Sequence, residues 1–180
     1  MREIPRCHAL THRFCDCSHL CFYRSCEEDS RGCLQRESWM TQEQANESLM
    51  LSVLAAFKDG NLGPLFEALS PDVVWTAAAP KEYFRFGGTH QGIAGMTEYT
   101  ALLFSRYHFT RFRPRLVAAK GDLVWGVFEV EALHQPNGRY VRFDISIHWT
   151  LKDGKITRHL GFFDTASVLM QQGDLLVEAA

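Results

Sequence analysis

The fold is decided by residues 123–164, which read LVWGVFEVEALHQPNGRYVRFDISIHWTLKDGKITRHLGFFD. Apolar and polar side chains alternate along this stretch in three runs, at 123–133, 140–151 and 155–164. Asn137-Gly138 lies between the first two runs, and Asp153-Gly154 lies between the last two. Such dipeptides between alternating runs are the strongest short-range signal of a β-hairpin. The stretch therefore predicts three consecutive antiparallel strands.

The side chains of these strands sort into an apolar inner face and a charged outer face. The inner face collects large apolar residues, namely Phe128, Val130, Ile145, Ile147 and Trp149. A preceding strand is predicted over residues 108–119, with Phe112 and Leu116 on the inner face. The outer face would carry opposite charges, namely Arg111, Arg113 and Arg115 against Glu129 and Glu131. Cross-strand pairs of this kind stabilise a sheet, so we expect the outer face to be solvated or packed in a dimer.

The register of the last strand depends on its turn, and the sequence leaves two alternatives open. A two-residue turn at Asp153-Gly154 would place Arg158 and Leu160 beside Ile147. A three-residue loop that begins at Lys152 would instead turn other residues inward, namely Thr157, His159, Gly161 and Phe163. The choice decides whether a histidine faces the interior of the domain.

Helices are predicted before these strands. Thr41 and Gln44 fit a capping box, and Asp59-Gly60-Asn61 would end the helix that follows. Further elements are predicted as a short helix at 64–69, strands at 72–78 and 83–88, a helix at 92–106, and a last helix from Asp164 to about Gln172. Helices followed by an antiparallel meander indicate a single α+β domain.

Composition and charge argue against several classes of function. The chain of 180 residues is long enough to form one domain with its own core. Its formal net charge is −2, so no basic surface favours nucleic acid or an anionic membrane. No apolar run approaches the ~20 residues of a membrane span. We therefore expect a cytoplasmic protein that binds neither nucleic acid nor membrane, and we predict no cofactor.

The six cysteines all precede residue 34, as Cys7, Cys15, Cys17, Cys21, Cys26 and Cys33. Their spacings lack the Cys-x2-Cys pairs of structural zinc sites, even if His8, His12 and His19 are counted as ligands. A disulfide framework would need a secretory signal, and the first ten residues lack the apolar core of one. We therefore expect residues 1–39 to be a leader outside the domain, disordered or read from a start codon placed too far upstream. The domain would span residues 40–180, and no metal site is predicted.

Three motifs resemble the SnoaL-like and ketosteroid-isomerase-like branch of the nuclear-transport-factor-two-like superfamily, over about residues 43–172. They are Phe57-x-Asp59-Gly60-Asn61-Leu62, Leu69-Ser70-Pro71-Asp72-Val73-Val74-Trp75, and Asp153-Gly154-Lys155-Ile156 through Phe163-Asp164-Thr165-Ala166. The resemblance implies a cone-shaped, cystatin-like α+β fold, in which a bent antiparallel sheet wraps around three N-terminal helices and a deep apolar pocket. It also implies the three-residue register, which would turn His159 into that pocket.

The catalytic groups of related enzymes are missing at the positions that the resemblance assigns to them. Ketosteroid isomerases use a tyrosine, a carboxylate base and a protonated aspartate, and the corresponding positions are Val53, Ala77 and Ile147. The acid of SnoaL-type cyclases also falls near Ile147. The Asp-Arg-Asp relay of limonene-epoxide-hydrolase relatives falls on Val130, Phe128 and Gly161. These side chains cannot transfer protons, so all three reactions are disfavoured.

His159 is the remaining candidate for acid–base chemistry, because an unperturbed imidazole titrates near neutral pH. A partner to orient it could be Tyr83, Tyr99 or Asp164, although Asp164 also fits a helix N-cap. The alternative is a structural histidine bonded within the core. The predicted ligand-binding wall consists of Trp75, Tyr83, Tyr99, Phe128, Val130, Ile145, Ile147, Trp149 and Phe163.

Two functions follow from these residues. The first is a non-catalytic pocket protein that binds a small hydrophobic metabolite, and that forms a homodimer through the convex face of its sheet. The second is an isomerase, cyclase or hydrolase that acts on a hydrophobic substrate through His159. The apolar residues at the assigned catalytic positions favour the first function.

Overall fold

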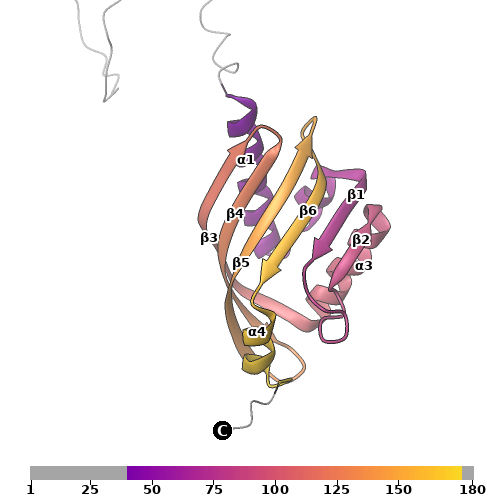
Figure 1. Ribbon diagram of the computed structural model, residues 1–180, viewed down its shortest axis with the longest axis vertical. Helices are drawn as coiled ribbons and strands as arrows, with labels where there is room; N and C mark the ends of the chain where they lie inside the picture. The colour runs from indigo at the N-terminus through magenta and orange to yellow at the C-terminus, as the bar shows by residue number, and fades with distance from the viewer. Residues whose placement is uncertain (1–39, 176–180) are drawn as a thin grey trace, which may run out of the picture. The chain divides into compact units, whose positions relative to one another are not determined.

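The computed structural model describes residues 40–175 (Figure 1). The predicted leader at 1–39 and its cysteines lie outside the described residues, so the predicted domain boundary stays a prediction. In the part of the chain that the structure describes, no helix is both long and apolar enough to cross a membrane.

The described residues form four helices, α1 (Gln42–Lys58), α2 (Gly63–Ala68), α3 (Gly92–Arg106) and α4 (Thr165–Gln172). The predicted capping box at the start of α1 is confirmed, because the Gln44 N–H donates to Thr41 Oγ1 at 3.2 Å and the Thr41 N–H donates to Gln44 Oε1 at 2.9 Å. The apolar stripe of α1 is buried at Met50 and Val53. Asp164 caps α4, since its carboxylate accepts the Ser167 N–H at 2.9 Å.

Six strands form one sheet in the order β2-β1-β6-β5-β4-β3. They are β1 (Leu69–Ala77), β2 (Gly88–Gln91), β3 (Tyr107–Lys120), β4 (Leu123–His134), β5 (Arg139–Lys152) and β6 (Lys155–Phe163). The predicted α+β class is correct, but the sheet is mixed, because β1 pairs with β6 in parallel. Figure 1 shows α1 behind the sheet and α4 at its lower end.

The turn between β5 and β6 combines parts of the two predicted alternatives. The turn itself is the two-residue kind, with Asp153 and Gly154 at φ 51° and 72°, as a type I′ hairpin requires. The register then shifts at Thr157, because Leu151 pairs with Ile156 whereas Thr150 pairs with Arg158. This bulge inserts one extra residue into β6. It therefore turns His159 inward without the predicted three-residue loop.

Residues 83–88 do not form the predicted strand. Residues 83–87 belong to the connection between β1 and β2, in which the Gly87 N–H donates to the Phe84 carbonyl at 2.6 Å. Phe84 and Phe86 are buried on either side of the exposed Arg85, so the alternation that predicted a strand arises from a turn. The neighbouring strand β2 begins only at Gly88.

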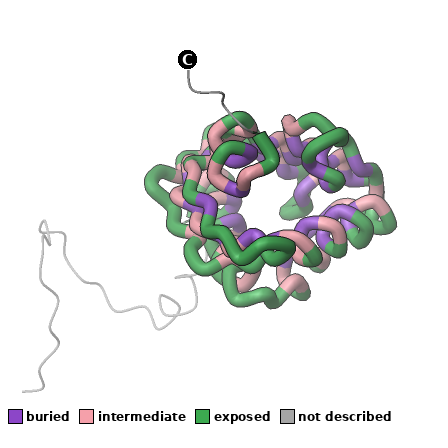
Figure 2. Tube along the Cα trace, turned by 90° about the horizontal axis from the view of Figure 1, so that it is seen from below, coloured by how far each residue is buried: buried purple, intermediate pink, exposed green. Residues whose placement is uncertain are grey.

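Alternation along β4 and β5 separates an inner face from an outer one, as predicted. Val130 and Ile147 are 1% and 5% exposed. Figure 2 shows buried, intermediate and exposed residues interspersed along the strands. The prediction is wrong for Leu116, which is 46% exposed. The register of β3 against β4 shifts between Pro114 and Leu116, so Val117 rather than Leu116 packs on the core.

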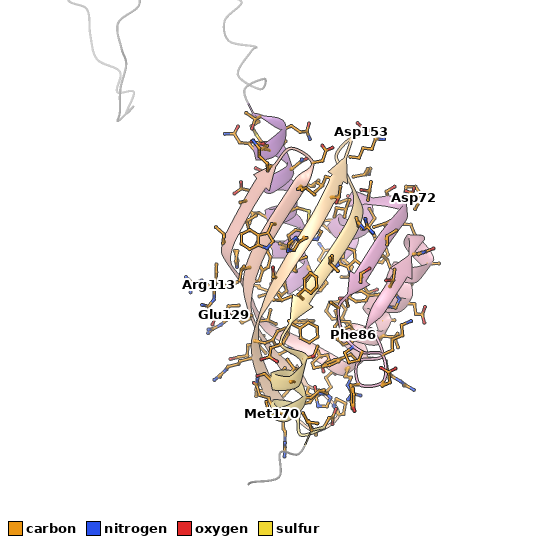
Figure 3. All side chains as sticks on the ribbon, in the orientation of Figure 1. Asp72, Phe86, Arg113, Glu129, Asp153 and Met170 are labelled. Atoms are coloured by element: carbon orange, nitrogen blue, oxygen red, sulfur yellow. The ribbon has the colours of Figure 1, made fainter. Side chains whose placement is uncertain are left out.

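The outer face carries a network of ion pairs. Arg111 bonds Glu129 at 2.9 Å, Arg115 lies 3.9 Å from Glu129 and 3.3 Å from Asp144, and Arg142 bonds Glu131 at 2.5 Å. Arg113 lies opposite Glu129 in the register but forms no ion pair with a described residue. Figure 3 shows Arg113 and Glu129 projecting from the edge of the sheet into solvent. The predicted ladder thus forms with Arg142 and Asp144 in place of Arg113.

Candidate functional site

The inner face of the sheet and the helices enclose an apolar cavity. About 80 Å³ of it is open to the centres of water-sized molecules, several times the ~10–15 Å³ that one water requires. Its lining residues come from α1, α2, α3, α4, the β1–β2 connection and five of the strands, and none of them is Lys, Arg, Asp or Glu. Such a wall favours an apolar molecule and offers no counter-ion to a charged one.

His159 lies in this wall because of the bulge at Thr157. It pairs in register with Trp149 on β5 and with Trp75 on β1, and it is 4% exposed. Its ring stacks on the Trp75 indole with centroids 3.6 Å apart and planes 1° from parallel. Gly161 keeps the other edge of the ring clear, since a Cβ added there would lie 3.1 Å from His159 Cε1. The histidine is therefore held in one orientation by its neighbours.

Burial makes His159 a weak base. Desolvation lowers its pKa from 6.5 to about 3, and the backbone of Thr76 only partly opposes this shift. The imidazole is consequently neutral at physiological pH. A general base works best when its pKa lies near the operating pH, so the surroundings of His159 do not prepare it for that role.

The partners predicted to orient His159 are not bonded to it. His159 Nδ1 is enclosed and forms no hydrogen bond with any described residue. Asp164 is occupied as the N-cap of α4, and the ring of Tyr83 is 49% exposed. Tyr99 lies in the cavity wall but does not hydrogen-bond to the imidazole. The triad-like arrangement that acid–base catalysis would use is therefore not formed by these residues.

His159 and three nearby rings form a group that we call the aromatic cluster: Trp75, Tyr99, Trp149 and His159. The centroid of Tyr99 lies 5.8 Å from that of Trp75, and the centroid of Trp149 lies 6.1 Å from that of His159. Both indole N–H groups are enclosed and lack a hydrogen-bond partner among the described residues. Burial raises the pKa of Tyr99 to about 12, so its hydroxyl stays protonated. The cluster thus holds indole N–H groups that no described residue satisfies.

Most other members of the predicted wall also line the cavity, namely Val130, Ile145, Ile147 and Phe163. Two do not. Tyr83 was predicted on a strand, but it lies in the β1–β2 connection and points to solvent. Phe128 is fully buried, but its ring folds back over Gly126 and lies behind the wall, against Trp149 and Phe112. Whether the lining residues bind a ligand stays a prediction.

Two residues of the cavity wall, both in the β1–β2 connection, were not predicted from the sequence. Phe84 and Phe86 are 0% and 5% exposed, and both line the cavity. His90 Nε2 donates to the Phe86 carbonyl at 3.0 Å and so holds the connection in place. Figure 3 shows Phe86 at the end of the sheet where α4 lies. Their apolar alternation around Arg85 was the available signal, but it was assigned to a strand.

Five of the six positions that the resemblance assigns to catalytic groups line the cavity, where such groups would contact a substrate. Val53, Ala77 and Ile147 all line the cavity, and so do Val130 and Gly161. Hydrocarbon side chains or glycine thus occupy cavity positions at which acids and bases would reach a substrate. Among residues 40–175, no group of three or more His, Cys, Asp or Glu side chains is arranged to hold a metal ion.

Comparison with known proteins places this geometry in a family. The family model of the SnoaL-like domain matches residues 51–159. No curated protein sequence matches the chain.

Solved structures share the fold. The structure of TerC, co-crystallised with polyporic acid, is 28% identical, with a TM-score of 0.64 over 71% of this chain and 97% of that chain. A nuclear-transport-factor-two-like protein of unknown function from Burkholderia pseudomallei is 21% identical, with a TM-score of 0.67 over 73% of this chain and 98% of that one. An epoxide hydrolase from M. tuberculosis is 18% identical, with a TM-score of 0.58 over 74% and 96% of the two chains. The fold predicted from the resemblance is therefore confirmed.

Proposed function

Because the chain belongs to the SnoaL-like domain family, we propose that its cavity binds a small, uncharged and largely apolar molecule and does not convert it chemically. The observation that carries this proposal is the composition of the wall, which has no Lys, Arg, Asp or Glu and has apolar residues at Val53, Ala77 and Ile147. The weak basicity of His159 supports it further. TerC, which was co-crystallised with a small organic molecule, is a precedent for binding in this fold.

A second candidate is an isomerase, cyclase or hydrolase that uses His159. The observation in its favour is that His159 lines the cavity and has an unpartnered ring nitrogen. A neutral imidazole with a pKa of about 3 could polarise a substrate by donating a hydrogen bond, but it would take up a proton inefficiently. Binding is therefore the function we favour.

Binding can be tested with indane, an uncharged hydrocarbon of two fused rings. Isothermal titration calorimetry of the full-length protein should give saturable binding with a dissociation constant below about 1 mM. Ala132→Leu should weaken this binding at least fivefold, because Ala132 is 0% exposed and the larger side chain would enter the cavity. Ala118→Leu, on the exposed side of β3, is the matched control and should bind normally. Absence of saturable binding to the wild-type protein would contradict the proposed function.

We also propose that the outer face of the sheet forms a homodimer. A contiguous aromatic row crosses this face, with His148 6.2 Å from Trp125 and 6.0 Å from Phe162 between ring centroids. Trp125 and Phe162 are 38% and 46% exposed. The flanking rows carry both signs of charge, including Arg113, which pairs with no residue in the range 40–175, so a second copy related by a two-fold axis can present complementary charges.

Trp125→Glu should convert this dimer to a monomer, because a carboxylate in the centre of an apolar contact would lose its hydration. Sedimentation velocity of the wild-type and variant proteins at equal concentration measures the change directly. Tyr83→Glu is the control, since Tyr83 is 49% exposed but lies in the β1–β2 connection. Weak dimers still form at concentrations on the order of 100 μM. A wild-type protein that sediments as a monomer at about this concentration would refute the dimer.

A further inference from the structure

The aromatic cluster contains more hydrogen-bond donors than the protein can satisfy. Trp75 Nε1 and Trp149 Nε1 are donors only, and both are enclosed without a partner among residues 40–175. His159 Nδ1 is likewise enclosed without a partner among these residues, and the Tyr99 hydroxyl lies in the same cavity wall as a further donor. Buried polar groups are nearly always hydrogen-bonded in native proteins, and each unpaired group costs stability. Three such side chains around one cavity, those of Trp75, Trp149 and His159, call for an explanation.

Packing keeps these donors together and prevents the protein from satisfying them. The Trp75 ring of β1 stacks on the His159 ring of the neighbouring strand β6. It also contacts the Tyr99 ring of α3. The nearby Trp75 indole partly offsets the rise in the Tyr99 pKa that burial causes. The indole N–H nevertheless lacks the geometry of a hydrogen bond to the Tyr99 hydroxyl. Trp149 is 1% exposed and is held from behind by Phe128. The rings therefore cannot rotate freely to pair with one another.

The wall also restricts the charge of any molecule that could satisfy the donors. No cationic side chain lines the cavity, and His159 is neutral, so an anionic oxygen would lose its hydration without gaining a counter-ion. A neutral carbonyl oxygen accepts two hydrogen bonds and has a much smaller cost of desolvation.

We infer that the aromatic cluster is the polar anchor of the cavity, and that it holds one uncharged acceptor oxygen, such as a ketone, on an otherwise apolar ligand. This inference rests on the proposed function, because it specifies which apolar molecules the cavity selects. The hydrocarbon wall supplies general affinity, whereas the indole N–H groups and the Tyr99 hydroxyl discriminate a ketone from its parent hydrocarbon.

The test compares 1-indanone with indane, which differ by one carbonyl oxygen. Calorimetry should show at least tenfold tighter binding of 1-indanone, the gain expected from two hydrogen bonds. Tyr99→Phe and Trp149→Phe each remove a donor and retain an aromatic ring. Each should lower the ratio of the indane dissociation constant to the 1-indanone dissociation constant severalfold, because a change in apolar wall contacts affects both ligands and cancels in this ratio. Trp125→Phe is the matched control, because Trp125 donates to Ser146 on the outer face.

A second readout does not depend on affinity. In 1H–15N spectra, 1-indanone should shift the indole N–H signals of Trp75 or Trp149 downfield, and indane should not. The signal of Trp125 should stay unchanged. Assignment uses the Trp→Phe variants, and the spectra also show whether each variant is folded.

The possible outcomes separate the two proposals. Equal binding of 1-indanone and indane, with no selective indole shift, would overturn the anchor and leave the proposed function standing. Failure of both ligands to bind would overturn the proposed function and the anchor with it. Tighter binding of indane-1-carboxylate than of 1-indanone would overturn the requirement for an uncharged ligand.

Discussion

Replacing Phe128 with alanine is expected to lower the free energy of unfolding by about 3–5 kcal/mol, the largest effect we expect from a single truncation in this domain. Phe128 is 0% exposed, and its ring lies over Gly126, where an added Cβ would come within 2.5 Å of Cζ. It also packs at 5.2 Å on Phe112 and at 5.8 Å on Trp149 between ring centroids. Truncation would leave a cavity that these rigid strands cannot close. Urea denaturation of the two proteins measures the difference.

Phe162→Ala is the control for this prediction, because Phe162 is 46% exposed on the outer face and should lose about 1 kcal/mol or less. A loss below about 1.5 kcal/mol for Phe128→Ala would show that the strands around Gly126 relax into the space. Phe128 also supports Trp149 from behind the cavity wall, so the variant should bind 1-indanone more weakly even where it remains folded.

Local sequence patterns predicted most of the helices and strands. They could not predict contacts between segments far apart in the chain. The strands β4, β5 and β6 were expected from alternation and from Asp153-Gly154, and they form within one residue of the predicted bounds. The parallel pairing of β1 with β6 brings Trp75 beside His159, and it joins segments far apart in the chain. No local pattern encodes such a contact, so the sheet was predicted to be antiparallel throughout.

Errors in the predicted faces come from bulges, which invert the alternation of every residue beyond them. The shift beside Arg115 turned Leu116 outward. The extra residue at Thr157 turns His159 inward, as the resemblance implied, although the turn itself has the two-residue form. The prediction for Phe128 failed for a different reason. Gly126, two residues earlier on the same face, leaves room for the Phe128 ring to fold along the strand, so the ring does not reach the cavity.

The stability of the protein is expected to fall steeply between pH 6.5 and pH 5 because of His159. The pKa of His159 is about 3 in the folded protein and 6.5 as its ordinary value. The unfolded chain therefore binds about half a proton more than the folded one at pH 6.5, and nearly one proton more at pH 5. Stability from this group is therefore fully present above pH 6.5 and is lost as the pH falls towards 3. The slope approaches about 1.4 kcal/mol per pH unit below pH 6, the value for one proton.

Urea denaturation across this pH range should show a flatter slope for His159→Phe than for the wild-type protein, since phenylalanine keeps a ring against Trp75 and cannot titrate. The outer-face residues Glu129 and Glu131 have pKa values lowered below 4.5 by hydrogen bonds from Arg111 and Arg142, so they contribute little in this window. The control is His108→Gln, which removes an exposed histidine of β3 that is not among the groups acting on His159, and which should keep the wild-type slope. If the wild-type and His159→Phe proteins lose stability in parallel, the imidazole takes up its proton equally in the folded and unfolded states. That result would contradict a desolvated His159 with a lowered pKa at the centre of the aromatic cluster.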